Sequence, residues 1–255
     1  MSILDKFRLD GKIALVTGAS VGLGAAIATA LAEAGADVAC HCHFDGEADE
    51  TCSQIETLGR ESFSVSGDMS DKEVPRNLVD KTIERFGRID ILINNAGMIR
   101  RAPAVDFSEE DWSTVLEVNL SSVFRLSQAA GRLMIEQGNG KIVNIASLLS
   151  FQGGITVPAY TASKSGVAGL TKAFANEWGK HNVNVNAIAP GYMATNNTTA
   201  LRADETRNRQ ILERIPAGRW GEPEDLAGAA VFLSSSASDY LQGHILIVDG
   251  GWMAR

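Results

Sequence analysis

The sequence has few of the features that mark secreted, membrane-bound or nucleic-acid-binding proteins. Its three cysteines, Cys40, Cys42 and Cys52, are odd in number and clustered, so they do not form a disulfide framework. No apolar run reaches the roughly 18 residues that a membrane-spanning helix needs, and the first residues lack the apolar stretch of a signal peptide. The net charge of −8 argues against binding to nucleic acid or to an anionic membrane. These absences predict a cytoplasmic protein that binds neither nucleic acid nor membranes.

One segment invites a metal hypothesis, because Cys40-His41-Cys42-His43 offers thiolate and imidazole groups, which are zinc ligands. No second ligand pair follows at the spacing of a zinc finger. Cys40 and Cys42 also continue the apolar run Asp37-Val38-Ala39, so alternate residues would share one face of a strand. We therefore expect a strand here and no metal site.

Strand-like apolar runs alternate with helical segments along the chain. We expect strands at 13–17, 37–42, 61–66, 89–93, 140–145, 183–188 and 245–248, and helices at 25–34, 47–58, 72–86, 109–136 (one helix or two), 159–178 and 224–233. This alternation predicts an α/β fold, a Rossmann-type doubly wound parallel sheet of about seven strands with helices on both faces. No Pro/Gly/Ser-rich linker splits residues 1–255, which predicts a single domain. Residues 192–221 are polar and lack a strong period, and we expect them to form a lid.

A glycine-rich turn follows the first expected strand. Gly18, Gly22 and Gly24 lie in the segment Thr17-Gly18-Ala19-Ser20-Val21-Gly22-Leu23-Gly24, ahead of an Ala-rich helix. Glycines let backbone N–H groups approach a pyrophosphate, and the helix offers its positive end to that anion. The spacing departs from G-x-G-x-x-G, but the position between a strand and a helix predicts dinucleotide binding.

The choice between NAD and NADP depends on the end of the second strand. An acid there would bind the adenosine ribose of NAD, and a cation would hold the 2′-phosphate of NADP. The segment Cys42-His43-Phe44-Asp45 has no acid at the immediate strand end and no Arg or Lys. We expect NAD, while NADP stays open because a protonated His43 could pair with a phosphate.

Three polar residues form a candidate catalytic set. Tyr160 and Lys164 are four residues apart in an expected helix, so their side chains share one face. A cation beside a phenol stabilises the phenolate and lowers its pKa from about 10 toward working pH. Such a tyrosine can exchange a proton with an alcohol or a carbonyl oxygen. Ser147 follows the fifth expected strand, where its hydroxyl could orient the reacting oxygen.

Together these motifs resemble the short-chain dehydrogenase/reductase superfamily over essentially the whole chain. The resemblance depends on residues that occur in the expected order, namely Thr17-Gly18-x-x-x-Gly22-x-Gly24, Asn94-Asn95-Ala96-Gly97, Asn119, Ser147, Tyr160-x-x-x-Lys164, Pro190-Gly191 and Thr195. One departure concerns the cofactor, because many NAD-using members have Asp where Cys42 falls.

The resemblance implies a role for each matching residue. Tyr160 would be the acid/base, Lys164 would lower its pKa and bind the nicotinamide ribose, and Ser147 would hold the substrate oxygen. Asn119 would help to hold a proton-relay water beside Lys164. The other matching residues would bind the cofactor: Gly18, Ser20, Gly22, Leu23 and Gly24 around the pyrophosphate, Asp68, Met69, Asn95, Ala96 and Gly97 on the adenosine side, and Ile188, Pro190, Gly191 and Thr195 on the nicotinamide side.

Within the superfamily, the sequence is most similar to dehydrogenases that interconvert the 5-keto and 5-hydroxy forms of a deoxy sugar acid in pectin and hexuronate breakdown. The similar stretches are 97–101, 150–154, 194–198, 214–221 and 249–255. Such a substrate carries a carboxylate, which suits the guanidinium of Arg100 or Arg101, with Arg219 and Arg255 as rivals. Gln152 and Asn196 could bond its hydroxyls.

Other readings keep the fold and change the function. The enzyme could act on gluconate-type sugars, steroids or 3-oxoacyl groups, but the polar run Thr195-Asn196-Asn197-Thr198-Thr199 in the expected lid favours a sugar. A nucleotide-binding module without catalysis would not need the intact Ser147, Tyr160 and Lys164. The segments 109–136 and 159–178 carry apolar residues on more than one face, so we expect a homotetramer, as in other members of the superfamily.

Overall fold

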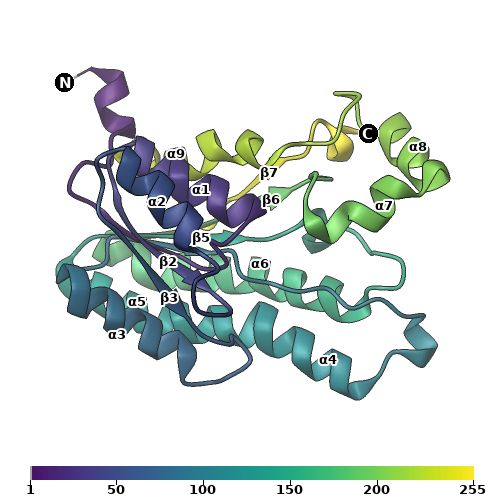
Figure 1. Cartoon of the computed structure of the whole chain (residues 1–255), viewed down its shortest axis with the longest axis horizontal. Helices are drawn as coiled ribbons and strands as arrows, with labels where there is room; N and C mark the ends of the chain where they lie inside the picture. Colours follow the sequence, from purple (N-terminus) through teal and green to yellow (C-terminus); the bar gives the residue numbers. More distant parts are fainter. Residues whose placement is uncertain (1) are drawn as a thin grey trace.

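A seven-stranded parallel sheet forms the centre of the computed structural model, which describes residues 2–255 (Figure 1). The strand order is β3-β2-β1-β4-β5-β6-β7, and every neighbouring pair is parallel. This order, in which the chain winds outward from β1 to both sides, is that of a doubly wound sheet, and it confirms the expected Rossmann-type fold. The strands are β1 (Ile13–Val16), β2 (Asp37–Cys42), β3 (Ser62–Ser66), β4 (Ile91–Asn94), β5 (Gly140–Ile145), β6 (Val183–Pro190) and β7 (Ile245–Val248).

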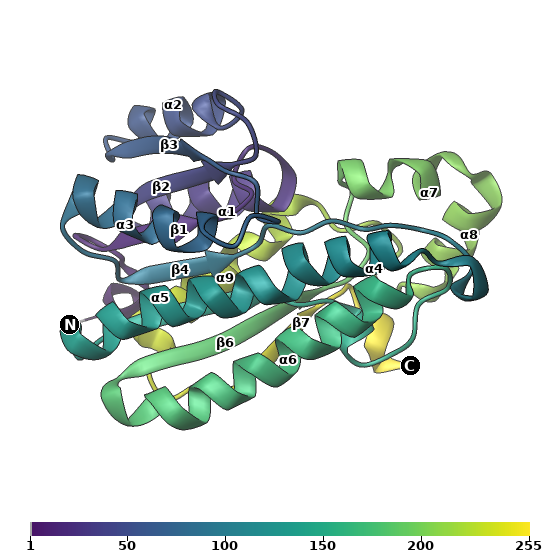
Figure 2. The same ribbon diagram turned by 90° about the horizontal axis from the view of Figure 1, so that it is seen from below.

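Helices cover both faces of the sheet, because each parallel connection must cross over it. One face carries α1 (Gly22–Glu33), α2 (Asp49–Thr57) and α9 (Ala227–Ser234), and the other carries α3 (Val74–Phe86), α5 (Ser122–Gln137) and α6 (Pro158–Trp178) (Figures 1 and 2). The short helices α4 (Glu109–Leu116), α7 (Thr199–Ala203) and α8 (Glu205–Arg214) lie toward the end of the molecule that holds the C-terminus. Among residues 2–255, no helix combines the length and the apolar character that crossing a membrane would take.

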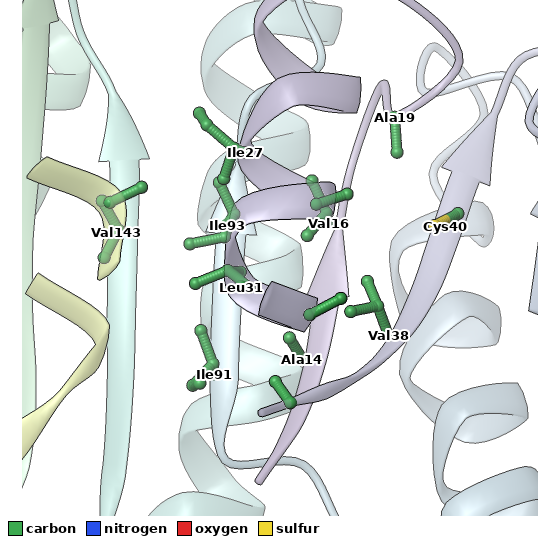
Figure 3. Packing of buried hydrophobic residues seen from close by; sticks show 14 of the residues in the cluster. Ala14, Val16, Ala19, Ile27, Leu31, Val38, Cys40, Ile91, Ile93 and Val143 are labelled. Carbon is green, nitrogen blue, oxygen red and sulfur yellow. The ribbon is translucent and has the colours of Figure 1, made fainter. Parts of the chain in front are cut away.

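Two large apolar clusters, one on each face of the sheet, form most of the core. Since successive strand residues face opposite sides, β1 contributes Ala14 and Val16 to the cluster beneath α1 and Leu15 to the other. Figure 3 shows Ile27 and Leu31 of α1 packed over the first of these clusters. Each such Leu or Ile contributes roughly 1.5–3 kcal/mol through its burial, so the two clusters fix the sheet that positions the site.

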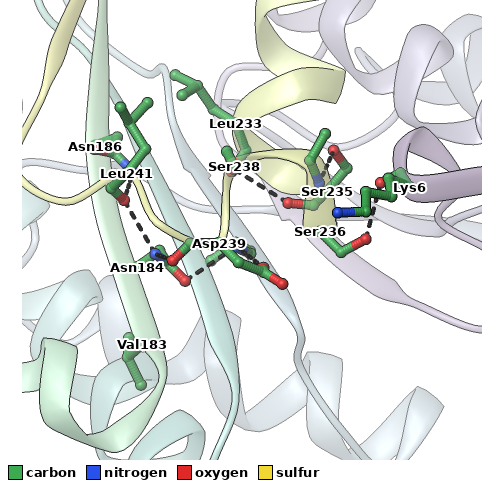
Figure 4. A network of polar contacts seen from close by, with 12 residues as sticks. Lys6, Val183, Asn184, Asn186, Leu233, Ser235, Ser236, Ser238, Asp239 and Leu241 are labelled. Atoms are coloured by element: carbon green, nitrogen blue, oxygen red, sulfur yellow. Dashed lines mark hydrogen bonds and ion pairs between the residues drawn. The ribbon is translucent and has the colours of Figure 1, made fainter. Parts of the chain in front are cut away.

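Polar contacts fasten the amino ends of the strands, at the edge opposite the site (Figure 4). Asn184 Nδ2 of β6 donates to the carbonyl oxygens of Asp239 and Leu241 at 2.9 and 3.0 Å. Buried Lys141 of β5 donates to Asn184 Oδ1 at 3.0 Å and pairs with Asp239 at 2.7 Å. Burial lowers the pKa of Lys141, and Asp239 raises it. These contacts hold the turn that leads into β7.

Two segments contain features that the sequence did not predict. Residues 109–136 form two helices, α4 and α5, which agrees with one of the two expected possibilities, but the π-helical turn that joins them at Glu117–Ser121 was not expected. Residues 192–221 contain α7 and α8, which we did not expect. They are hard to predict because α7 has five residues and α8 has Ile211 as its one buried residue, so neither shows an apolar period.

Candidate active site

The expected catalytic residues meet at the carboxyl ends of the central strands, where doubly wound folds bind their ligands. Ser147 lies two residues beyond the end of β5, and Tyr160 and Lys164 lie in the first half of α6. Lys164 Nζ is 5.6 Å from the centroid of the Tyr160 ring. It also donates a hydrogen bond to the Ile145 carbonyl oxygen at 2.6 Å. The structure therefore brings Ser147, Tyr160 and Lys164 together at one strand end.

The pKa of Tyr160 differs from the sequence expectation. Burial raises the pKa of the Tyr160 phenol above its ordinary value, whereas hydrogen bonding with Ser147 and the positive charge of Arg101 lower it. Burial lowers the pKa of Lys164 itself to about 8. The pKa of Tyr160 is therefore shifted upward and not downward as expected, because the sequence argument counted the neighbouring charge and left out the desolvation of the phenolate, which is the largest influence.

Asn119 lies in the π-helical turn and is fully buried. Its Oδ1 accepts from the Met98 amide and its Nδ2 donates to the Met98 carbonyl oxygen, both at 2.8 Å. Nδ2 is also 3.3 Å from Ser163 Oγ. A π-bulge often marks a functional site, and here the side chain fixes the segment that follows β4. The expected role of Asn119 beside Lys164 stays a prediction.

The glycine-rich turn joins β1 to α1. Gly18 and Gly22 have φ angles of +64° and +59°, which favour glycine. A Cβ on Gly24 would lie 1.9 Å from the Gly18 carbonyl oxygen, so only glycine fits there. Asn95 Nδ2 donates to the carbonyl oxygens of Thr17 and Gly18 at 2.9 and 3.0 Å. Asn95 thus braces the turn, and the first N–H groups of α1 remain for an anion.

Two further residues shape this turn: His41, which the sequence analysis did not name as a site residue, and Thr17, which it named in the motif without a role. His41 of β2 accepts the Gly18 amide at Nδ1 (3.2 Å), so Nε2 carries the proton and donates to the Gly67 carbonyl oxygen at 2.9 Å. Burial lowers the pKa of His41, which favours this neutral form. Thr17 Oγ1 accepts from the amides of Asn95 and Ala96, both at 3.0 Å. The available signal for His41 was its place between Cys40 and Cys42 near the end of the expected second strand, since the sequence argument used that strand only against a metal site.

The expected adenosine-side residues follow the ends of β3 and β4. Asp68 is exposed, and its Oδ1 accepts from the Ser70 amide at 2.8 Å, a contact that lowers the pKa of the carboxyl. The charge of His43 also lowers that pKa, and the His43 ring lies 4.1 Å from the centroid of Phe44. Met69 is buried in the core, and Gly97 lies next to Asn119, where a Cβ would be 3.3 Å from Oδ1. Leu23 is partly buried against the core on the α1 face.

The expected nicotinamide-side residues follow β6, which ends at Pro190. The Gly191 amide donates to the Val248 carbonyl oxygen at 2.9 Å, and a Cβ on Gly191 would lie 2.6 Å from Asp249 Cα, so β6 and β7 approach closely here. Thr195 Cγ2 would lie 3.7 Å from a Cβ on Gly22. The structure thus brings Thr195 to the glycine-rich turn.

The ends of segment 192–221 are bonded to each other. Met193 and Gly221 form a parallel bridge. The Ala194 amide donates to the Gly221 carbonyl oxygen at 2.7 Å, and the Gly221 amide donates to the Tyr192 carbonyl oxygen at 2.9 Å. The segment therefore leaves and rejoins the fold at one point.

The candidate substrate residues are not equivalent. Arg100 Nε lies 3.4 Å from the Asp111 carboxylate, and Arg219 pairs with both oxygens of Asp225 at 2.6 and 2.9 Å. Arg255 donates to the carbonyl oxygens of Glu213 and Arg214. Among residues 2–255, Arg101 has neither an ion pair nor a hydrogen bond through its guanidinium, and its charge acts on Tyr160. Gln152 is partly buried next to Phe151, and Asn196 is exposed in the expected lid.

Comparisons with known proteins agree with this geometry. A family model described as enoyl-(acyl carrier protein) reductase matches residues 18–253. The 2-dehydro-3-deoxy-D-gluconate 5-dehydrogenase of Escherichia coli is 58% identical over 254 residues, covering 99% of this chain and 100% of that protein. A crystal structure from Agrobacterium tumefaciens with bound NADP is 56% identical, with a TM-score of 0.92 and coverage of 98% and 99%.

A second crystal structure extends the likeness. It is a gluconate 5-dehydrogenase from Burkholderia cenocepacia in complex with NADP and tartrate, 40% identical, with a TM-score of 0.95 and full coverage of both chains. Identity at this level over the full chain, with the same sheet, shows common descent and not the fold alone. The chain is an oxidoreductase that belongs to the short-chain dehydrogenase/reductase family.

Proposed function

We propose that this enzyme interconverts the ketone and the alcohol at C5 of a deoxy sugar acid, as 2-dehydro-3-deoxy-D-gluconate 5-dehydrogenases do, with NAD(P) as cofactor. The observation that carries the proposal is the meeting of Ser147, Tyr160 and Lys164 at the end of β5, where Lys164 Nζ is 5.6 Å from the centroid of the Tyr160 ring. The positive charge of Arg101 also lowers the pKa of the phenol. A proton donor within electrostatic reach of a cation suits a substrate that has both a carbonyl and a carboxylate. The 58% identity to the Escherichia coli enzyme supports the same substrate class.

Tyr160 exchanges the proton. Because burial raises its pKa, the phenol is protonated at neutral pH and can donate to the carbonyl oxygen of a ketone during reduction. Ser147 donates a hydrogen bond to the same oxygen and orients it. The Lys164 ammonium, one helical turn from Tyr160, stabilises the phenolate that proton donation leaves behind. Bound NAD(P) supplies or accepts the hydride at the neighbouring carbon.

The residues fit a dinucleotide. The glycines at 22 and 24 let the turn approach Thr195 and the Gly18 carbonyl oxygen closely, and a pyrophosphate would bind against the N–H groups of the first turn of α1. Ser20 and Leu23 would border the pyrophosphate with the glycines of the turn. The adenosine side would be bordered by Asp68, Met69, Asn95, Ala96 and Gly97, and the nicotinamide side by Ile188, Pro190, Gly191 and Thr195. NAD remains our expectation, and NADP, which two similar structures hold, is accommodated too.

Arg101 is the best partner for the substrate carboxylate. The rival guanidiniums of Arg100, Arg219 and Arg255 already have partners within the chain. A guanidinium without a counterion gains most from a carboxylate, since a charge-assisted hydrogen bond contributes about 1.5–3 kcal/mol. Gln152 and Asn196 would bond the hydroxyls.

The test is a substrate panel with matched variants. Purified protein is given NADH or NADPH with 5-keto sugar acids and with neutral 5-keto-fructose, and nicotinamide absorbance is followed. We expect the 5-keto form of 2-dehydro-3-deoxy-D-gluconate to have the highest kcat/KM. Arg101→Gln should raise the KM of the acids about 10- to 100-fold and change the neutral sugar little.

Arg100→Gln is the control, because its guanidinium is paired with Asp111, and it should leave the KM of the acids within about threefold. Reduction of acyl or steroid ketones in preference to every sugar acid would contradict the proposed function. Equal effects of Arg101→Gln on acidic and neutral substrates would contradict the role of Arg101.

We also propose that the chain forms a homotetramer. In support, Leu120, Phe124, Gly166 and Leu170 line a groove of about 460 Å³ between α5 and α6, and Phe124 is 40% exposed. Two such faces would bury each other. Light scattering at micromolar concentration should give about four times the 27.1 kDa of one chain.

Phe124→Glu should lower that mass, since it adds a charge to the apolar face, whereas Phe124→Leu should not. A wild-type mass near that of one chain would refute the proposal. The lid at 192–221, a cytoplasmic location and a place in pectin breakdown stay predictions from the sequence.

A further inference from the structure

Thr156 has an unusual backbone conformation. Its φ angle is +62°, and the only other non-glycine residue with positive φ among residues 2–255 is Asn182. Asparagine tolerates the left-handed region, but a β-branched threonine there is an outlier. Such outliers persist only where the surroundings hold them, and they cluster at functional sites. Thr156 lies four residues before Tyr160.

The surroundings fix Thr156 from both sides. Before it, a Cβ on Gly154 would lie 2.7 Å from Leu149 Cδ1 and 2.5 Å from Val157 Cγ2, so the chain is packed tightly at that point. After it, Val157 is buried and its carbonyl oxygen accepts the first hydrogen bond of α6, from the Thr161 amide at 3.0 Å. The Thr156 hydroxyl donates to the Ile155 carbonyl oxygen at 2.6 Å, which compensates part of the cost of this conformation.

The conformation links two loops that border the candidate site. The Thr156 carbonyl oxygen accepts a hydrogen bond from the Ala102 amide at 3.0 Å. Ala102 ends the segment 98–102, whose beginning is held by the two bonds between Met98 and Asn119. Within this segment Arg100 faces Asp111. The segment is therefore held at both ends, and Arg101 is its one charged side chain without a counterion.

We propose that Thr156 is a positioning residue for the substrate carboxylate: its left-handed backbone directs its carbonyl oxygen to the Ala102 amide and thereby fixes the backbone that carries Arg101. This inference rests on the proposed function, because it assumes that Arg101 binds the carboxylate. The positive charge of Arg101 lowers the pKa of Tyr160, so the guanidinium is within electrostatic reach of the phenol. A backbone that is already fixed loses less conformational freedom when the substrate binds, so the substrate binds more tightly.

The experiment compares backbone-compatible and backbone-incompatible variants. Thr156→Gly and Thr156→Asn allow positive φ and keep the carbonyl oxygen, so they should leave the KM of the sugar acid within about threefold. Thr156→Pro forbids positive φ and should raise that KM about tenfold, with little change in kcat and in the KM of neutral 5-keto-fructose. Ala102→Pro removes the amide donor from the other partner and should have the same effect, with Ala102→Gly as its control.

A second readout does not depend on turnover. Hydrogen exchange measured on the peptide that covers residues 98–104 should show a protected Ala102 amide in the wild type, in Thr156→Gly and in Thr156→Asn. Thr156→Pro should lose that protection, and Thr161 should keep its own. This arm reports on the link between the loops even if the wild type rejects every sugar acid, an outcome that would refute the proposed function alone.

Either of two results would overturn the positioning role. The first is a Thr156→Pro or Ala102→Pro variant that stays folded and keeps the KM of the sugar acid within about threefold. The second is an equal loss with the acidic and the neutral substrate, which would assign Thr156 to the general support of α6. If Thr156→Pro fails to fold, Ala102→Pro alone tests the positioning role, because it leaves Thr156 and the start of α6 unchanged.

Discussion

Replacement of Tyr160 by phenylalanine is expected to lower kcat by about 10²- to 10⁴-fold, the usual contribution of a positioned general acid or base. The variant keeps the ring that packs near Lys164 and removes the one hydroxyl that can exchange a proton with the substrate oxygen. Cofactor binding, measured by NADH fluorescence, should stay within about threefold of the wild type, because the glycine-rich turn is unchanged. Tyr240→Phe is the matched control, since that side chain is fully exposed.

The wild type should show the pH dependence that belongs to this proton. Burial raises the pKa of Tyr160, so the phenol stays protonated through neutral pH and reduction should not need acid. Alcohol oxidation needs the phenolate, and its kcat should therefore rise as the pH increases above neutral. If Tyr160→Phe kept more than a tenth of the wild-type kcat, Tyr160 would not be the residue that exchanges the proton.

Gly24→Ala is expected to abolish tight cofactor binding and to destabilise the fold. The new Cβ would lie 1.9 Å from the Gly18 carbonyl oxygen and 2.6 Å from Asn95 Nδ2, so the turn would have to open. Overpacking of this kind costs about 1–3 kcal/mol, and a displaced turn no longer presents its N–H groups to a pyrophosphate. Urea unfolding and NADH titration measure the two effects, and we expect the Kd for NADH to rise more than 100-fold.

Gly228→Ala is the control for the substitution itself. Gly228 lies in α9, where nothing is within 4 Å of a new Cβ. Alanine in a helix stabilises by roughly 0.5–1 kcal/mol relative to glycine, so stability should rise slightly and NADH binding should be unchanged. Normal NADH binding by Gly24→Ala would mean that the pyrophosphate does not bind at this turn.

Much of the fold follows from local patterns. The central strands are buried on both faces and so appear in the sequence as short apolar runs, which alternate with longer helical segments. Because parallel connections have one preferred winding, the sheet could be predicted from this alternation. The candidate site could also be predicted from local patterns, because the carboxyl ends of the parallel strands converge and Tyr160 and Lys164 are one helical turn apart. Asn119 was predicted as a site residue. Its π-helical turn and its hydrogen bonds to the Met98 backbone could not be predicted, because they depend on contacts between distant segments.

The expectations that failed depend on environment and not on sequence spacing. Burial reverses the expected shift in the pKa of Tyr160, and no spacing reveals how much water a folded site excludes. His41 became a brace for Gly18 only because β2 and the glycine-rich turn lie side by side. The positive φ of Thr156 leaves no mark in composition, because threonine is not the residue that such a conformation favours.

The junction of Tyr192 and Met193 with Gly221 has an evolutionary consequence. A segment whose two ends close on each other can gain, lose or exchange residues without moving the strands from which it departs. Descendants of one ancestor can therefore change the sequence of this segment while the strands that carry Ser147 and the glycine-rich turn stay in place. Diversity in such a lineage should concentrate between these two attachment points.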